Sequence, residues 1–189
     1  MIFRSQQAEL HLPNTDLASL ALSRAEELNS KPALIDGTTG DTLSFGELKQ
    51  KVDHIATGLA LRGFKKGDVL AIFCPNVPEY AIAYLAVAKI GGINTTVNSL
   101  YSTEDLIHQF TDSGARFLLT IPAFLDRARP AAAACGIEEI FVLGEAENTT
   151  PFQQLLQNDG SVPPKVGIDA SKDLVALPYS SGTTGLSLT

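Results

Sequence analysis

The run Val69-Leu70-Ala71-Ile72-Phe73 is apolar at every position, and it decides the fold class of this chain. A helical pattern over residues 79–90 separates it from a second strand-forming run, Ile93–Val97. A strand without polar alternation is typical of a parallel sheet that helices cover on both faces. The succession of strand, helix and strand is a βαβ unit, so we predict an α/β fold with a mostly parallel sheet flanked by helices.

The same alternation continues toward the C-terminus. We predict further strands and helices from the apolar periods of the sequence. The strands are Phe117–Thr120, Ile140–Leu143 and Leu174–Leu177, and the helices are Thr103–Ser113 and Ala123–Cys135. Residues 144–165 are rich in Asn, Asp, Gly and Pro and are predicted as a loop that holds a short helix at 152–157.

Local signals organise the first third of the chain. Asn14-Thr15-Asp16 can cap a helix that runs to about Asn29. Short apolar runs at 33–36 and 42–45 predict a hairpin. Ser44 and Glu47 have the spacing of a capping box, and we expect the helix that they open to end at Gly63. Lys65-Lys66, which follow, are interpreted as a solvated turn.

Composition limits the classes of function. With 189 residues, of which 44% are hydrophobic, the chain is expected to form one domain with a buried core. A net charge of −7 argues against a nucleic-acid partner. The most apolar run, Ala81–Ile93, contains Lys89 and is shorter than the roughly 20 residues of a membrane span. No secretory signal is visible at the N-terminus, so we expect no membrane partner and a cytoplasmic location.

The cysteines and histidines do not form a recognisable reactive site. Cys74 and Cys135 are too few and too far apart for a disulfide framework, and we interpret both as buried thiols. His11, His54 and His108 lack the spacing of metal ligands. We therefore predict no catalytic residue and no metal site among them.

A loop rich in hydroxyls and glycine follows the last predicted strand. It reads Tyr179-Ser180-Ser181-Gly182-Thr183-Thr184-Gly185-Leu186. Hydroxyls and backbone N–H groups suit phosphate oxygens, and the glycines allow the backbone to approach a ligand closely. Ligands of α/β sheets gather at the carboxyl ends of the strands. The predicted cofactor-binding residues are Ser180, Ser181, Gly182, Thr183, Thr184 and Gly185.

This loop resembles the phosphate-binding motif of adenylate-forming enzymes, in which Pro-Lys-Gly follows, whereas Ser187-Leu188-Thr189 stands here. From about Phe3 to Leu186, the chain is most similar to the 4-coumarate-CoA ligases and related acyl-CoA synthetases. Further matching patches in the same order are Pro32–Gly37, Gly67–Phe73, Pro75-Asn76, Pro78–Tyr80, Gly91–Asn98 with Tyr101, and Asp173–Tyr179. We interpret most of these patches as architecture; Pro75-Asn76 could line a site, yet turn chemistry explains it as well.

The resemblance implies a fold, a reaction and a set of partners. The chain would be the N-terminal part of the large domain of such a ligase, cut at the phosphate-binding loop 179–186, with the C-terminal domain absent. The family joins a small carboxylic acid to ATP, with Mg²⁺, to form an acyl-adenylate and then passes the acyl group to coenzyme A.

Because most of that machinery is missing, we expect the chain not to catalyse alone. Two alternatives stay open: a noncatalytic module that binds nucleotide or regulates a full-length relative, and an inert fragment. An unpaired strand edge near Leu174–Leu177 would also favour a homo-oligomer.

Overall fold

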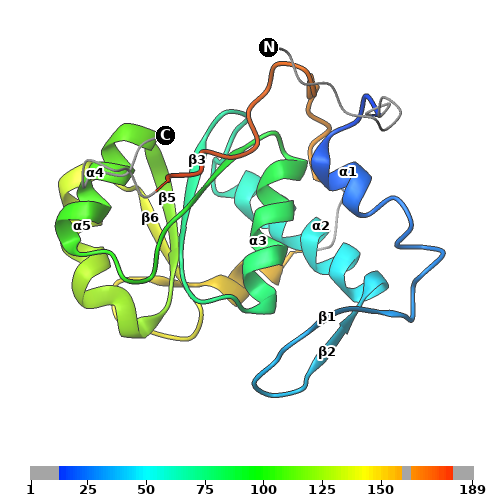
Figure 1. Cartoon of the computed structure of the whole chain (residues 1–189), viewed down its shortest axis with the longest axis horizontal. Coiled ribbons are helices and arrows are strands. Elements are labelled where there is room, and N and C mark those ends of the chain that lie inside the picture. The colour runs from blue at the N-terminus through cyan, green and yellow to red at the C-terminus, as the bar shows by residue number, and fades with distance from the viewer. Residues whose placement is uncertain (1–12, 159–162, 181–189) are drawn as a thin grey trace, which may run out of the picture.

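A computed structural model describes residues 13–158 and 163–180, which form three layers with a sheet in the middle (Figure 1). The helices are α1 (Leu17–Ala21), α2 (Phe45–Leu61), α3 (Pro78–Lys89), α4 (Thr103–Ser113) and α5 (Leu125–Cys135), with 3-10 helices η1 (Pro122–Phe124) and η2 (Phe152–Leu156). The strands are β1 (Pro32–Ile35), β2 (Thr42–Ser44), β3 (Val69–Phe73), β4 (Ile93–Thr96), β5 (Ala115–Thr120), β6 (Glu139–Val142) and β7 (Thr150–Pro151).

The central sheet is parallel throughout. Its strand order is β4-β3-β5-β6-β7, so β3 lies between the two strands that follow it in the chain. In register, Val69 of β3 faces Ile93 of β4 on one side and Ala115 of β5 on the other. The predicted α/β fold with a mostly parallel sheet flanked by helices is confirmed, and so is the hairpin, which forms as β1 and β2.

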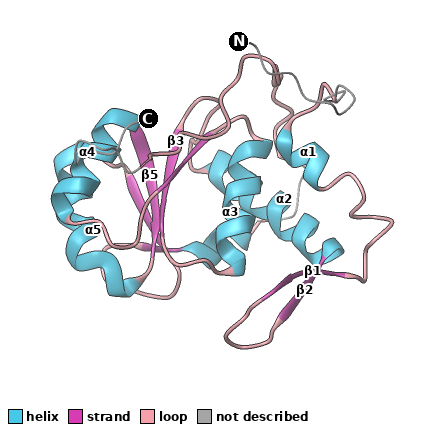
Figure 2. Cartoon of the chain, in the orientation of Figure 1, coloured by secondary structure: helices cyan, strands magenta, loops and turns pink. Residues whose placement is uncertain are grey.

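The side chains of β3 alternate between two separate cores. Leu70 and Ile72 belong to the cluster that packs against α2 and α3, whereas Val69, Ala71 and Phe73 belong to the cluster under α4 and α5. Figure 2 shows these helix pairs on opposite sides of the sheet. All five residues of β3 are buried, which explains the apolar run.

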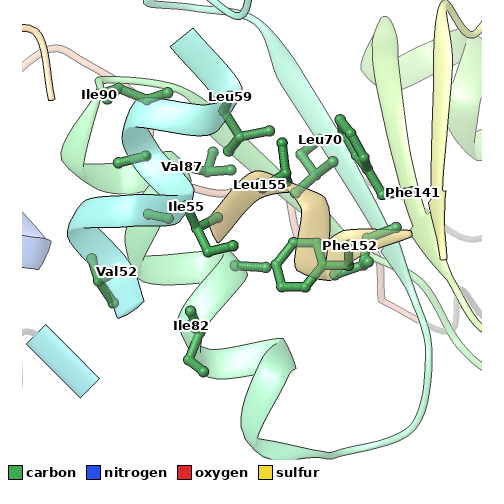
Figure 3. Packing of buried hydrophobic residues seen from close by; sticks show 14 of the residues in the cluster. Val52, Ile55, Leu59, Leu70, Ile82, Val87, Ile90, Phe141, Phe152 and Leu155 are labelled. Carbon is green, nitrogen blue, oxygen red and sulfur yellow. The ribbon is translucent and has the colours of Figure 1, made fainter. Parts of the chain in front are cut away.

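The larger core joins α2, α3, the sheet and η2. Figure 3 shows Ile55 and Leu59 of α2 facing the η2 residues Phe152 and Leu155, with Leu70 of β3 beside them. Full burial of each large apolar side chain contributes about 1.5–3 kcal/mol relative to its exposed state. The short 3-10 turn η2 therefore closes the core from a segment about 100 positions away from α2 in the chain.

Both predicted capping arrangements are present. The Ser44 N–H donates to Glu47 Oε2 at 2.8 Å, and the Glu47 N–H donates back to Ser44 Oγ at 3.3 Å. Ser102 and Asp105 form the same reciprocal pair at the start of α4. At the other end of α2 the cap residue is Arg62, one position before the predicted Gly63, which takes the left-handed turn at φ 84°.

The predicted first helix is wrong in its length. The Asp16 cap is real, since Asp16 Oδ1 accepts from the Ser19 N–H at 2.8 Å, but α1 ends at Ala21 instead of near Asn29. At Ser23 both the backbone N–H and the hydroxyl reach the Leu20 carbonyl. This local bonding competes with the regular helix, and turns replace it up to residue 30.

The strand predicted at Leu174–Leu177 is also wrong. The segment makes a single parallel bridge, Ala176 with Asn94 of β4, through the Asn94 N–H to Val175 O and the Leu177 N–H to Asn94 O. The two carbonyls that a further rung would use accept side-chain hydrogen bonds, Leu177 O from the Thr95 hydroxyl at 3.1 Å and Thr96 O from Gln109 Nε2 at 3.1 Å.

Two further details differ from the sequence-based expectations. The two-residue strand β7 adds an edge to the sheet beside β6 within the predicted loop. Lys66 is not simply solvated: its Nζ contacts Asp173 Oδ2 at 2.6 Å and the Gly167 carbonyl at 2.7 Å, so it tethers the segment that leads to residue 174.

Across the described residues, no helix is long and apolar enough to cross a membrane.

Gly58 of α2 provides a test of this packing. A Cβ at this position would lie 2.3 Å from the Leu155 carbonyl oxygen and 2.9 Å from Leu155 Cα. We predict that Gly58→Ala lowers the free energy of unfolding by about 1–3 kcal/mol because the backbone of η2 must move. The helix propensity of alanine alone would instead raise stability by up to about 1 kcal/mol. Urea unfolding followed by circular dichroism measures the difference.

Gly37→Ala is the matched control, because nothing lies within 4 Å of the added methyl group. A Gly58→Ala protein that is as stable as the parent, or more stable, would contradict the close contact between α2 and η2.

Candidate functional site

A cavity opens at the carboxyl ends of β3 and β4. Its volume is about 540 Å³, and its walls come from the loops after the two strands, from α3 and from the end of the described chain. The lining residues are Cys74, Pro75, Asn76, Tyr80, Thr96, Val97, Asn98, Ser99 and Tyr179. This is the edge at which open α/β sheets hold their ligands.

The predicted phosphate-binding loop begins at this cavity. Tyr179, its first residue, is one of the lining side chains, and Ser180, which follows, is exposed. The other predicted binding residues, Ser181, Gly182, Thr183, Thr184 and Gly185, lie outside the described residues. The structure therefore locates only the first two residues of the predicted loop, Tyr179 and Ser180.

Pro75-Asn76 line the cavity, although the sequence favoured a scaffold role for them. Asn98 serves the turn: its Oδ1 accepts from the Leu100 N–H at 3.0 Å. Pro75-Asn76 follow the end of β3, and Asn98 follows the end of β4. The turns that leave the sheet therefore also form part of the cavity wall. A single position can serve both roles, and the sequence does not separate them.

The loop after β4 is held in place by Arg127 of α5. Its Nη1 donates to the carbonyls of Ser99 at 3.0 Å and Tyr101 at 2.6 Å. The guanidinium lies over the rings of Phe73 and Phe124, with its carbon 5.2 and 4.9 Å from the ring centres. Phe73 is the last residue of β3, so Arg127 links the two strand ends that form the cavity. Its sequence context carried no signal of this role.

Polar side chains on β4 attach the segment that enters the loop. Asn94 and Thr95 are fully buried within an otherwise apolar core. Asn94 Nδ2 donates to the Tyr84 carbonyl at 3.1 Å, and Gln109 Nε2 of α4 donates to Thr95 Oγ1 at 2.7 Å. Sequence reasoning missed these three residues as a group. The available signal was the pair of consecutive polar residues inside a predicted buried strand.

Tyr179 donates its hydroxyl hydrogen bond to Asp112 Oδ2 of α4 at 2.5 Å. Partial burial, and then the hydrogen bond and charge of Asp112, raise the pKa of the phenol well above its usual range, so it stays protonated. The phenol of Tyr80 across the cavity also has a raised pKa because it is half-buried. Both rings are therefore neutral groups at ordinary pH.

Cys74 is a buried thiol, as predicted. Burial, with a smaller contribution from the charge of Glu79, raises its pKa to about 12. A thiol in this state is a poor nucleophile. Cys135 is half-buried, and both cysteines are free. His54 has a structural contact, with Nδ1 3.2 Å from the Leu156 carbonyl.

The chemistry of the cavity is that of neutral hydrogen-bonding groups. Amides and hydroxyls line it, and no Lys or Arg is among its lining residues. Within residues 13–158 and 163–180, no cluster of three or more His, Cys, Asp or Glu side chains could hold a metal ion. The arrangement can orient a polar ligand, but these side chains alone do not balance the charge of a triphosphate.

Comparison with known proteins places this architecture in a class. The fold matches that of a long-chain-fatty-acid-CoA ligase from Archaeoglobus fulgidus with a TM-score of 0.85 at 21% identity, over 96% of this chain and 37% of that one. An anthranilate-CoA ligase in complex with anthranoyl-AMP gives a TM-score of 0.80 at 21% identity, over 93% and 34% of the two chains. The fold is thus that of the N-terminal portion of an adenylate-forming ligase.

The chain belongs to the family of AMP-binding enzymes, whose sequence model matches residues 22–187. It is 37% identical to 4-coumarate-CoA ligase 5 of Oryza sativa subsp. japonica and 33% identical to 4-coumarate-CoA ligase 2 of Petroselinum crispum. Both alignments cover 98% of this chain and 34% of the relative. The chain therefore spans about a third of the length of these relatives, and the resemblance to 4-coumarate-CoA ligases is confirmed.

The raised pKa of Cys74 leads to a prediction about its reactivity. In a Cys135→Ser variant, we expect Cys74 to react with iodoacetamide at pH 8 about a thousandfold more slowly than after unfolding in urea, because a pKa near 12 rather than 9.0 reduces the thiolate fraction by that factor. Mass spectrometry of timed samples gives both rates. Comparable rates in the folded and unfolded protein would show that Cys74 is accessible and ionised.

Proposed function

We propose that this chain is the N-terminal portion of an ATP-dependent carboxylate-CoA ligase, acting on a 4-coumarate-like or a fatty acid. The reaction would join the carboxylate to the α-phosphate of ATP with release of pyrophosphate, and then transfer the acyl group to the thiol of coenzyme A with release of AMP. The observation that carries the proposal is the position of Tyr179: the first residue of the predicted phosphate loop lines the cavity at the carboxyl ends of β3 and β4.

Each predicted loop residue has a role in this proposal. The hydroxyls of Ser180, Ser181, Thr183 and Thr184 would donate to the β- and γ-phosphates, and Gly182 and Gly185 would let backbone N–H groups approach them. Donors fixed around departing pyrophosphate stabilise charge that develops in the transition state. Because the cavity walls are neutral, Mg²⁺ would have to supply part of the balancing positive charge.

The remaining expectations are also proposals. The small carboxylic acid, ATP and coenzyme A are the partners we propose for the whole enzyme, in the cytoplasm and without nucleic acid or membrane. A homo-oligomer is also proposed, because Leu174 leaves 57% of its surface exposed. Residues 175–177 leave less of the strand edge unpaired than the sequence predicted, since they bond to β4 on one side.

The first test measures nucleotide affinity. Leu188 stands where the family motif has lysine, and loss of a charge-assisted partner removes about 1.5–3 kcal/mol. We predict that this chain binds Mg·ATP with a dissociation constant weaker than micromolar in calorimetry, and that Leu188→Lys tightens binding at least tenfold. Leu188→Gln is the control for a longer polar side chain without charge.

Submicromolar binding by the parent chain would contradict this account of the loop. Equal gains from lysine and glutamine would show that charge is not the missing element.

The second test concerns catalysis. Positioning of bound reactants can account for about 7–11 kcal/mol of a barrier, and these 189 residues correspond to 34% of the length of the rice relative. We predict only background exchange of labelled pyrophosphate into ATP with cinnamic, benzoic and fatty acids. The double variant Ser187→Pro/Leu188→Lys should give the same result.

A full-length 4-coumarate-CoA ligase in the same assay is the positive control. Exchange above background with any acid, in protein free of other ligases, would make this chain an enzyme by itself. Submicromolar ATP binding without exchange would favour the alternative of a noncatalytic nucleotide-binding module.

A further inference from the structure

Few backbone hydrogen bonds attach residues 174–180, the segment that enters the predicted phosphate loop, to the sheet. Two backbone hydrogen bonds join it to β4, at Val175 and Leu177. The next anchored position is Tyr179, and its anchor is the side-chain hydrogen bond to Asp112. The contact between Tyr179 and Asp112 therefore continues the attachment two residues beyond the last of these backbone hydrogen bonds, at Leu177.

Asp112 is exposed, but the helix that carries it is packed against the sheet. It lies near the end of α4, a helix that begins with the reciprocal cap of Ser102 and Asp105 and buries Leu106 and Phe110 against the sheet. Three positions earlier, Gln109 bonds to Thr95 and to the Thr96 carbonyl of β4 at 2.7 and 3.1 Å. Residues three apart project from neighbouring positions of a helix surface, so α4 reaches both β4 and Tyr179 from one side.

The direction of the hydrogen bond matters for what Tyr179 can do. The carboxylate of Asp112 can only accept, so the phenol donates its single proton to it and does not offer that proton to an anionic ligand in the cavity. Tyr179 thus behaves as a link between α4 and the loop.

We propose that Asp112 is a positioning residue, which holds the entrance of the predicted phosphate loop against α4 through the Tyr179 hydroxyl. The consequence for nucleotide binding rests on the proposed function, whereas the consequence for the segment itself does not. Asp112 contacts no ligand in this proposal. It restricts where Ser180 and the residues after it begin.

Hydrogen exchange with mass spectrometry tests the positioning directly, using the whole chain and peptides that cover residues 174–180. We expect Asp112→Ala and Tyr179→Phe each to speed exchange there about tenfold, and the double variant to be no faster than either single one, since both remove the same bond. Asp112→Asn should stay within about twofold of the parent, because its amide oxygen can still accept. Peptides from β5 should be unchanged.

Two matched controls remove similar groups elsewhere. Glu104→Ala deletes an exposed acid from the same helix, and Tyr84→Phe deletes the hydroxyl of another half-buried tyrosine. Both should leave exchange at 174–180 unchanged. Parental exchange in Asp112→Ala, additive effects of the two substitutions, or failure of Asp112→Asn to restore protection would each overturn the proposal.

Calorimetry with Mg·ATP then separates this inference from the proposed function. If the parent binds, Asp112→Ala and Tyr179→Phe should weaken binding by a similar factor; faster exchange with undiminished affinity would overturn the role of Asp112 in the loop. If the parent binds no ATP, the proposed nucleotide site is wrong, and hydrogen exchange alone decides whether Asp112 positions the segment.

Discussion

The structure depends on the complete burial of β3 between two parallel neighbours. Its five residues are divided between two cores, and β4 and β5 occupy its two edges. A parallel strand in this position needs a helix on each face, so the crossovers through α3 and α4 follow from it. Because β4 and β5 lie on opposite sides of β3, the loops after β3 and β4 meet at one edge of the sheet, where the cavity opens.

The edge strand β4 has a second function, which its buried polar residues explain. Asn94 and Thr95 would be costly inside an apolar core if they lacked partners. The Asn94 amide nitrogen and the Thr95 hydroxyl instead donate to the carbonyls of residues 175 and 177, and Gln109 Nε2 of α4 donates to Thr95 Oγ1. Among the described residues, the amide oxygens of Asn94 and Gln109 are buried without a hydrogen-bond partner. The polar groups thus specify which segment lies beside the edge of the sheet, and in which register. Arg127 fixes the loop after β4 in a similar way, by donating hydrogen bonds to its carbonyls.

Local signals predicted the local structure well. The reciprocal contacts of Ser44 with Glu47 involve residues three positions apart, so sequence spacing is sufficient to find them. The failures arose where distant groups compete for the backbone. Leu174–Leu177 has the apolar character of a strand, but it makes a single bridge, at Ala176, and its Leu177 carbonyl accepts from the distant Thr95 hydroxyl. Lys66 looked solvated because its partner Asp173 lies far along the chain.

The sequence by itself determined the α/β class, the parallel sheet, the main helices and the family, because apolar periods, caps and ordered motifs depend on neighbouring residues. It also predicted that a phosphate-binding loop begins at Tyr179. Only the tertiary structure decided which side chains contact the segment that leads to this residue. Asp112, Arg127 and Gln109 contact residues that lie 13 to 67 positions away in the chain. No local pattern records such contacts, since chain folding alone brings α4 and α5 to the carboxyl edge of the sheet.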